Sequence, residues 1–462
     1  MTLDDLLNQV DRQFQDSLDR LCDLLKIPSI STDPQFRDEC RRAADWLESD
    51  LNSIGFSASV RDTDGHPMVV AHGERSSSNV LFYGHYDVQP VDPLEKWHHA
   101  PFEPAIVSEN GQKSIHARGA SDDKGQLMTF IEACRVWKDV TGKPPAGISV
   151  LLEGEEESGS PSLIPFLKEN ADELKADLAF ICDTGLFESE IPAIITQLRG
   201  LMGIEFEITG PSVDLHSGMY GGLAVNPIQI LGNIISDLFD VDGRVMIENF
   251  YEGVLELEPL HKTQWDNLNF DQQGFLGDIG LQLPIGEIDR TPLEKLWSRP
   301  TCEINGISGG YAGDGFKTVI PSKASAKVSC RLVGNQDPQQ IRDNFRSFVE
   351  SRIPSDCSVK FINHGLAGAC QMPTSDPMFE IARSALTKEW QKEAVFAGCG
   401  GSIPIAGYFQ EFLGMDSLLT GFGKDKDNIH SPNEKYDFDS FYHGIRSWIR
   451  ILYNSQPQPR QK

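Results

Sequence analysis

Two patterns of hydrophobic and polar positions divide the chain. From about residue 40 to residue 198, short unbroken apolar runs alternate with segments of helical periodicity; the runs are "MVVAHG", "NVLFYG", "ISVLLEG" and "DLAFICD". Unbroken apolar runs are typical of parallel strands covered on both faces. Between them, "DDKGQLMTFIEACRVWKDV" places Leu127, Phe130, Ile131 and Cys134 on one helical face. This half of the pattern predicts an α/β domain with a mostly parallel sheet and helices on both faces.

The pattern changes after Gly200. The segments "LMGIEFEITG" and "KASAKVSCRLV" alternate strictly between apolar and polar residues, which is typical of a sheet with one open face. Helical segments follow Pro227 and Pro338, and "CSVKFIN" supplies a further strand. The order strand, helix, strand, strand, helix, strand predicts a ferredoxin-like α+β domain. We therefore expect residues 200–366 to be inserted into an α/β domain formed by 1–199 and 367–462.

Composition narrows the function. The chain has 462 residues with 41 Lys plus Arg against 68 Asp plus Glu, and the resulting net charge of −27 argues against binding to nucleic acids or anionic membranes. We expect no membrane span and no signal peptide, because the N-terminal segment shows the periodicity of an amphipathic helix instead. The nine cysteines are scattered without a Cys-x-x-Cys pair, which indicates reduced thiols and a cytoplasmic protein.

Groups that can bind metals follow the apolar runs. "NVLFYG" leads to His85 and Asp87, "ISVLLEG" leads to the run Glu155–Glu157, and "DLAFICD" ends at Asp183. Further candidates are Asp122 and Asp123 in "RGASDDKG" and His430 in "NIHSPNEKYD". Because ligands of open parallel sheets gather at the carboxyl ends of the strands, we expect these side chains to converge.

Each of these residues also has a simple structural explanation. Asp122 or Asp123 is suited to cap the following helix, the glutamate run to form a solvated turn, and Asp183 to begin an Asx turn. These separate explanations do not account for a potential ligand after every apolar strand. Converging carboxylates repel each other unless a cation lies among them, and two histidines with three carboxylates suffice for two metal sites. A further glutamate would then activate water, so the pattern favours a di-metal hydrolase.

The motifs also carry a family resemblance. "GHYDVQP", "RGASDDKG", "EGEEESGS", "ICDTG", "DLHSG", "KTVIP", "CGGSIP" and "HSPNEK" occur in the order found in the di-zinc peptidase family of carnosinase, cytosolic nonspecific dipeptidase, carboxypeptidase G and succinyl-diaminopimelate desuccinylase. The resemblance covers nearly the whole chain and looks closest to the carnosinase-like dipeptidase branch. It implies that Asp122 bridges two metals, with His85 and Asp183 completing one site and Glu157 and His430 the other. Asp87 would orient His85, and Glu156 would be the general base.

The resemblance also assigns roles in the inserted domain, as a lid and dimerisation domain. His216 would reach the site of a partner subunit and polarise the scissile carbonyl, and Arg331 would bind the terminal carboxylate of the substrate. For Arg331, a solvated strand face shared with Lys327 remains the alternative. Thr318 and Ser402 would line the carboxylate end of the pocket. Cys399 departs from the pattern, which places a polar or charged residue before "GGSIP".

Together these features predict a cytoplasmic, homodimeric metallopeptidase that cleaves dipeptides or very short peptides with a free C-terminal carboxylate. We expect two divalent ions per subunit, namely zinc, although manganese and cobalt accept the same ligands. An N-acyl-amino-acid deacylase or desuccinylase is the alternative that uses the same residues. A non-catalytic binding protein is disfavoured because every ligand and the base are present. The side-chain preference is left open by the sequence.

Overall fold

The computed structural model describes residues 1–401 and 403–456, which form two compact units. The first unit comprises residues 1–196, 372–397 and 408 onwards, and the second comprises 197–371 and 398–407. Each unit is described by itself below.

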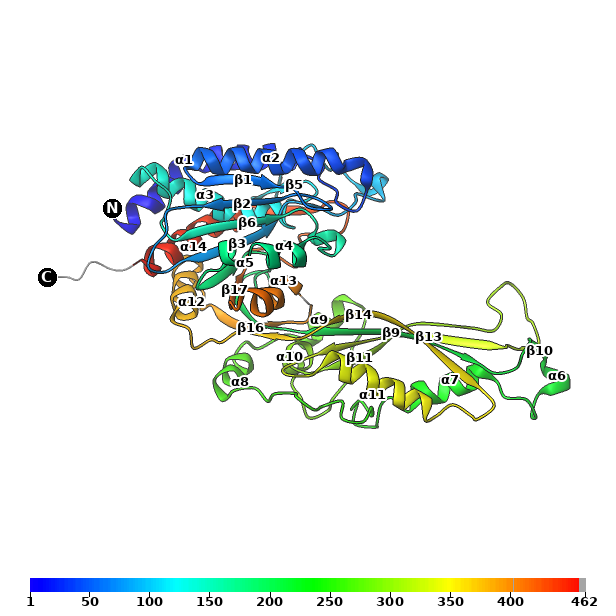
Figure 1. Cartoon of the computed structure of the whole chain (residues 1–462). Helices are drawn as coiled ribbons and strands as arrows, with labels where there is room; N and C mark the ends of the chain where they lie inside the picture. The colour runs from blue at the N-terminus through cyan, green and yellow to red at the C-terminus, as the bar shows by residue number, and fades with distance from the viewer. Residues whose placement is uncertain (402, 457–462) are drawn as a thin grey trace. The chain divides into compact units, whose positions relative to one another are not determined.

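The first unit is built from long helices around a large sheet (Figure 1). Its helices, with α13 at the boundary, are α1 (Leu3–Leu25), α2 (Arg37–Ile54), α3 (Lys124–Thr141), α4 (Leu163–Glu169), α5 (Ala171–Leu174), α12 (Pro377–Trp390), α13 (Pro404–Tyr408) and α14 (Phe438–Ser455). The strands of the large sheet that lie within this unit are β1 (Ser57–Arg61), β2 (Met68–His72), β3 (Val80–His85), β6 (Ile148–Glu153), β7 (Leu178–Ile181) and β17 (Ser417–Thr420). The sheet also contains β8 (Ala193–Leu198) and β16 (Val395–Cys399), which cross the boundary in the chain, and β15 (Cys370–Gln371), which belongs to the second unit. A small sheet contains β4 (Ala105–Glu109), β5 (Gln112–His116) and β18 (Lys435–Asp437).

The large sheet has the order β1-β2-β6-β3-β7-β17-β8-β15, with β16 paired to β8. Its central strands β6, β3, β7 and β17 are parallel to one another. This confirms the predicted α/β class with a parallel centre. Strand β2 differs from the expectation, since it is antiparallel to both β1 and β6. The unbroken apolar run of β2 shows that the strand is buried. It carries no information on the direction in which the strand runs.

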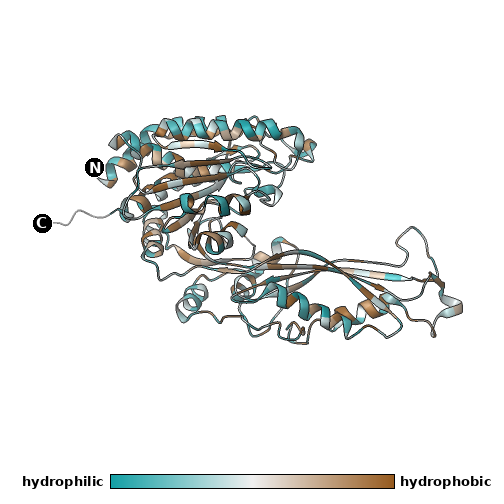
Figure 2. Ribbon diagram, viewed as in Figure 1, coloured by the Kyte–Doolittle hydropathy of each residue, from teal (hydrophilic) through white to brown (hydrophobic). Residues whose placement is uncertain are grey.

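Helices lie on both faces of this sheet. The chain passes from β3 through α3 to β6 on one side and from β6 through α4 and α5 to β7 on the other, and right-handed crossovers in opposite directions place these helices on opposite faces. Helix α3 packs against α1, α14 and β3. In the core, the rings of Phe82 and Phe130 stack at 3.9 Å between centroids, and Trp448 lies edge-on to both. The strands are largely brown in Figure 2, whereas the outward faces of α1 and α2 are largely teal.

This topology fixes where a ligand can bind. The chain continues from β3 to β6 on one side and later returns to β7 on the other, so the strand order reverses beside β3. In open α/β sheets, ligands bind at the carboxyl ends of the strands at such a point. His85 is the last residue of β3 and lies at that edge.

The second unit contains a four-stranded antiparallel sheet of order β11-β13-β9-β14. Its strands are β9 (Gly200–Thr209), β11 (Thr301–Gly309), β13 (Lys323–Leu332) and β14 (Ser358–Ala367), with the two-residue strands β10 (Leu215–His216) and β12 (Val319–Ile320) forming a separate pair. Helices α7 (Pro227–Ser236) and α11 (Pro338–Glu350) pack on the four-stranded sheet. The order of these elements along the chain and the order of the strands in the sheet are those of a ferredoxin-like fold, which the sequence predicted from the order of its elements.

The core of this unit follows the period of two. On β13, Ala324, Ala326, Val328, Cys330 and Leu332 are buried beneath the helices, and the intervening residues are more exposed. The segment between α7 and β11 adds short helices: α8 (Pro259–Asp266), α9 (Gln272–Asp278) and α10 (Pro292–Trp297), while α6 (Ser217–Tyr220) follows β10.

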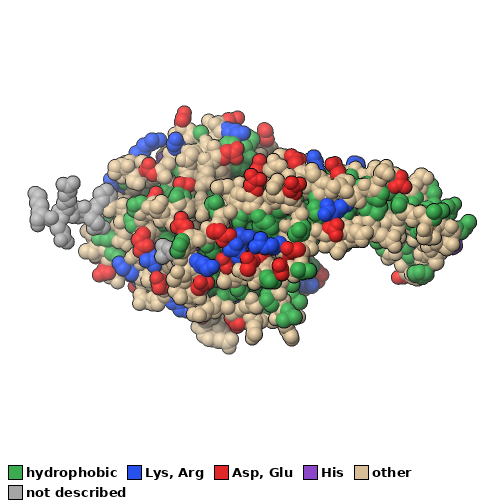
Figure 3. Space-filling view, turned by 90° about the horizontal axis from the view of Figure 1, so that it is seen from below, with side chains coloured by type: hydrophobic (Ala, Val, Ile, Leu, Met, Phe, Trp, Pro, Cys, Tyr) green, Lys and Arg blue, Asp and Glu red, His purple; other side chains and the backbone are tan. Residues whose placement is uncertain are grey.

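Across the described part of the chain, no helix has the length and apolarity to cross a bilayer. Figure 3 shows one face of the protein, on which acidic and basic side chains are interspersed among polar and apolar ones. The strong negative net charge is therefore not gathered into one acidic patch on this face.

Candidate metal centre

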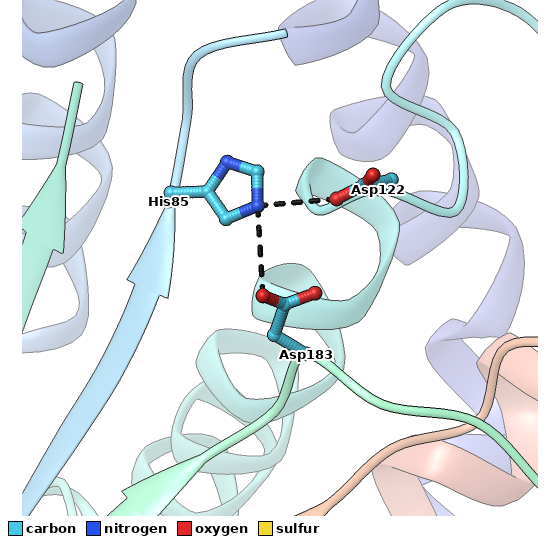
Figure 4. Close-up of side chains that lie close together, drawn as sticks. All are labelled: His85, Asp122 and Asp183. Carbon is cyan, nitrogen blue, oxygen red and sulfur yellow. Dashed lines mark hydrogen bonds and ion pairs between the residues drawn. The ribbon is translucent and has the colours of Figure 1, made fainter. Parts of the chain in front are cut away.

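The first cluster of metal-binding groups forms around His85. Its Nε2 lies 3.1 Å from Asp122 Oδ1 and 3.9 Å from Asp183 Oδ2. Figure 4 shows the three side chains pointing toward one another, with His85 at the end of β3, Asp183 just after β7 and Asp122 in the loop before α3. The histidine is fully buried, so the cluster lies inside the first unit at the carboxyl edge of its sheet.

A second cluster shares Asp122 with the first. His430 Nε2 lies 2.9 Å from Asp122 Oδ2 and 3.3 Å from Glu157 Oε2. In each cluster the three potential ligand atoms lie within 4.8 Å of one another. One oxygen of Asp122 thus faces His85 and the other faces His430. The structure therefore brings together all five side chains that the sequence nominated as ligands.

The charges in the clusters favour cations. Burial, together with the nearby Asp122, Glu156 and Glu157 carboxylates, raises the pKa of Asp183 to about 8 although His85 opposes this. Burial would also raise the pKa of Asp122, but hydrogen bonds from His430 and His85 hold it well below its usual range. Hydrogen bonds to Asp122 and Glu157 raise the pKa of His430 to about 10. Burial would lower the pKa of His85, but hydrogen bonds with Asp122 and Asp87 raise it. The acids around both imidazoles therefore favour a positive charge, which a divalent cation supplies when the imidazoles bind it in the neutral form.

The donor set fits such ions. Each cluster offers one imidazole nitrogen and two carboxylates, and these are ligands that zinc, manganese and cobalt accept. A carboxylate that offers one oxygen to each cluster can contribute a ligand to each of two metal ions held close together. The residues present therefore fit two divalent cations held by His85, Asp183, Asp122, Glu157 and His430.

Asp87 supports the ligands without belonging to either cluster. It is fully buried, and its Oδ1 lies 3.4 Å from His85 Nδ1. The same carboxylate accepts hydrogen bonds from the backbone N–H groups of Glu156 at 3.2 Å and Glu157 at 3.0 Å. An acid on the second ring nitrogen fixes the orientation of a ligating imidazole. Asp87 therefore links the position of His85 to that of the glutamate loop.

The three adjacent glutamates occupy different environments. Glu155 is buried and accepts hydrogen bonds from His66 N at 2.7 Å and Ser162 N at 2.9 Å, so it holds the loop in place. Glu157 belongs to the second cluster and accepts a hydrogen bond from Gln89 Nε2 at 2.7 Å. Burial raises the pKa of Glu156, and Glu157 adds to the rise while His85 opposes it. Glu156 therefore lies in the field of the clusters as a carboxylate outside both ligand sets.

Three residues of this site received no specific role from the sequence. Asp123 stands at the N-cap of α3 but makes no side-chain cap; its Oδ2 accepts a hydrogen bond from His85 N at 3.1 Å. The helix-cap explanation therefore fails for its side chain. Gln89 contacts Glu157, and Glu434 accepts the backbone N–H of Asp122. Gln89 and Glu434 stand within the quoted motifs, which is the only sequence signal for them, whereas Asp123 is also one of the acids expected to converge.

Two further candidates, His216 and Thr318, meet in the second unit. His216 pairs with Val319 across β10 and β12, and Ser217 N donates to Thr318 O at 3.1 Å. The exposed His216 accepts a hydrogen bond from Gly218 N at its Nδ1, 3.0 Å away. The neutral ring therefore carries its proton on Nε2, where it can be donated to a carbonyl oxygen.

Arg331 lies on the more exposed face of β13, beside Arg199. Burial lowers the pKa of Arg199, and the nearby positive charge of Arg331 lowers it further. The Arg199 Nε donates to Gly400 O at 2.9 Å, in the segment that begins with Cys399. Two neighbouring guanidinium groups form a site of positive potential suited to an anion. Ser402 lies outside the described residues, so its predicted role stays a prediction.

Comparison with known proteins places the chain among peptidases. A model of the peptidase family M20/M25/M40 matches residues 81–454. The Cys-Gly metallodipeptidase dug1 of Schizosaccharomyces pombe is 30% identical, with 98% of each chain covered. The structure is similar to that of an M20 family metallo-carboxypeptidase of Sulfolobus solfataricus (TM-score 0.81, 32% identity, 94% of this chain and 98% of that one). It is also similar to human carnosine dipeptidase 1 (TM-score 0.77, 25% identity, 98% of each chain).

Proposed function

Because the chain belongs to the peptidase family M20/M25/M40, we propose that it is a cytoplasmic, homodimeric di-zinc dipeptidase that hydrolyses the amide bond next to a free C-terminal carboxylate. The observation that carries the proposal is the carboxylate of Asp122, shared between two clusters, with Glu156 beside them. The metallodipeptidase and carnosine dipeptidase named above act on dipeptides, which supports the same substrate class here.

The residues of the first unit divide the chemistry between binding and proton transfer. Divalent cations, when bound, supply Lewis acidity that lowers the pKa of water and polarises a carbonyl. His85, Asp122, Asp183, Glu157 and His430 hold them. Glu156 accepts the proton of the attacking water and then delivers it to the leaving amine. Burial raises its pKa toward neutrality, which suits a group that must both take and return a proton.

The residues of the second unit act on the substrate. The Nε2–H group of His216 donates a hydrogen bond to the carbonyl oxygen as negative charge develops on it. Arg331 forms a bidentate pair with the terminal carboxylate of the substrate. Thr318 and Ser402 complete the pocket at that end. In a two-fold dimer, His216 serves the site of the partner subunit.

A substrate panel tests this proposal. Purified protein is stripped with a chelator, reloaded with Zn²⁺, Mn²⁺ or Co²⁺, and assayed on dipeptides, dipeptide amides, and acetyl- and succinyl-amino acids. We expect hydrolysis of free dipeptides that disappears on stripping and returns with metal. The Asp122→Asn variant is the matched control, because it keeps the shape of the shared ligand and should lose both metals and activity.

Two results would count against the proposal. Hydrolysis of acyl-amino acids without hydrolysis of dipeptides would establish the deacylase alternative. Metal binding without hydrolysis of any substrate would instead indicate a binding protein.

A further inference from the structure

Glu434 is a buried carboxylate whose place in the site has no assigned role. It lies four residues after His430, and its side chain is fully buried. Its Oε1 accepts hydrogen bonds from Ser121 N at 2.8 Å and Asp122 N at 3.0 Å. Its Oε2 accepts from Gly119 N at 2.9 Å and from the guanidinium of Arg118 at 2.8 Å. One side chain therefore receives four hydrogen bonds.

All four donors belong to the loop that carries the shared ligand. The backbone N–H of Asp122 is itself one of them, so Glu434 fixes the main chain from which the Asp122 carboxylate projects. That carboxylate must face His85 with one oxygen and His430 with the other, at 3.1 Å and 2.9 Å. The loop gains no support from a side-chain cap at the start of α3. Four of the hydrogen bonds that hold this loop therefore end on the side chain of Glu434.

The same residue ties this loop to the segment that carries His430. Ala117 N donates to Glu434 O at 3.1 Å, and β18, which begins at the next residue, pairs with β5. Ser121 Oγ donates to Asp427 at 3.0 Å across the same two segments. Asp122 and His430 meet in the second cluster. The two segments that carry them are therefore joined by the hydrogen bonds of Glu434.

Only a carboxylate satisfies this arrangement. Two oxygens accept two hydrogen bonds each, and the guanidinium of Arg118 faces the negative charge. A glutamine at this position would have only one accepting oxygen. Its NH₂ group would face either the N–H groups of Ser121 and Asp122 or the donors of Gly119 and Arg118, and a donor cannot accept their hydrogen bonds. Asp87 stands in a comparable relation to His85 and the glutamate loop. The ligands are thus held by two buried acids that do not bind metal themselves.

We propose that Glu434 is a positioning residue that sets the metal affinity of the centre by fixing the shared ligand Asp122 against His430. The proposal rests on the di-metal function proposed above. Groups that orient metal ligands typically change metal affinity about 10- to 100-fold when they are replaced. Because Asp122 belongs to both clusters, we expect Glu434→Gln to weaken both sites by about that factor.

The experiment measures zinc binding, independently of activity. Chelator-stripped protein is titrated with Zn²⁺ in competition with a chromogenic chelator, which gives the number of ions and their affinities. The matched control is Glu132→Gln in α3. Glu132 is also fully buried and accepts hydrogen bonds from arginines, Arg20 and Arg135, but it contacts no ligand. This control should lose stability and keep the zinc affinity of the wild type.

Each outcome decides the matter. Two tight sites in the wild type and in Glu132→Gln, both weakened in Glu434→Gln, support the positioning role. Unchanged affinity in Glu434→Gln, or an equal loss in Glu132→Gln, overturns it while leaving the proposed function intact. A wild type that binds no zinc overturns both. Should Glu434→Gln fail to fold, Glu434→Asp replaces it: the charge is kept, the reach to Asp122 N is lost, and unchanged affinity again refutes the proposal.

Discussion

Replacement of the two adjacent glutamates Glu156 and Glu157 should separate proton transfer from metal binding. Glu157 Oε2 lies 3.3 Å from His430 Nε2 and also accepts a hydrogen bond from Gln89. Glu156 belongs to neither ligand set. We therefore expect Glu157→Ala to lose metal together with activity. Glu156→Ala should keep both metals and lose activity alone.

The magnitudes follow from these positions. A positioned general base contributes about 10²–10⁴ in rate, or roughly 3–5 kcal/mol of activation free energy, so Glu156→Ala should lose turnover by that factor. Glu157 provides one of three ligands in the second cluster, and its removal leaves only His430 and Asp122. Both backbone N–H groups still reach Asp87, so the loop itself should remain in place in either variant.

The assay measures metal content and turnover on the same preparations. Metal is counted per chain after gel filtration, and turnover is measured on a free dipeptide at saturating metal. Glu155→Ala serves as a loop control, because Glu155 secures the loop through His66 and Ser162 and should lose stability first. Equal metal loss in Glu156→Ala and Glu157→Ala would refute the assignment of the base. A Glu157→Ala variant with two metals would refute the second cluster.

Two other predictions concern Arg331 and Glu389. If Arg331 binds the terminal carboxylate, Arg331→Ala should strongly lower kcat/KM for a free dipeptide and leave kcat/KM for the dipeptide amide nearly unchanged. An equal loss of kcat/KM on both substrates would mean that Arg331 has another role. Burial would raise the pKa of Glu389, but its hydrogen bonds with His443, Arg450 and Arg446 lower it to about 2. Because the pKa of Glu389 is lower in the folded state than in the unfolded state, where it is near 4.5, its ionised form stabilises the fold above that pH. This stabilisation is lost as the pH falls toward 2. Glu389→Gln should therefore lower the free energy of unfolding by about 2–3 kcal/mol at pH 7. Urea unfolding of both proteins should show this difference shrinking by about a third between pH 5 and pH 3.5, and a constant difference would contradict it.

The fold class was predictable because the burial of a strand determines which of its positions are apolar. Unbroken apolar runs identified β3, β6 and β7, and strict alternation identified β9 and β13. The antiparallel direction of β2 was not predictable, because direction depends on how the chain returns to the sheet and not on which residues are buried. The order of the ferredoxin-like sheet followed from the sequence of its elements.

The ligands were predictable for a related reason. His85 and Asp183 follow apolar strands, and parallel strands end at one edge, so their meeting could be inferred without coordinates. Glu434 and Asp123 could not be assigned in this way, because most of their partners are backbone N–H groups, which every residue except proline possesses. The bond from Asp122 N to Glu434 spans 312 positions of the chain, and no periodicity connects them. Supporting residues of this kind become visible only from the folded chain.

The last prediction concerns the site to which His216 contributes. It stands at the end of β10 with its Nδ1 engaged by Gly218 N, so its Nε2–H is available to a carbonyl oxygen. Because His216 would be a single oxyanion donor, His216→Ala should lower turnover about 10²–10³-fold and keep both metals. We expect it to act on the partner subunit of a two-fold dimer. Equal amounts of His216→Ala and Glu156→Ala, unfolded and refolded together, should then regain about a quarter of wild-type activity, because half the dimers are hybrids with one intact site of two.

The controls make this test decisive. Different affinity tags on the two variants show whether hybrid dimers form, and each variant refolded alone gives the baseline. If His216 acts within its own chain, every site in a hybrid lacks either His216 or Glu156, and the mixture stays at the baseline. An inactive mixture that contains hybrid dimers would therefore exclude a shared site. A mixture without hybrids, from a protein that elutes as a monomer, would exclude the dimer itself.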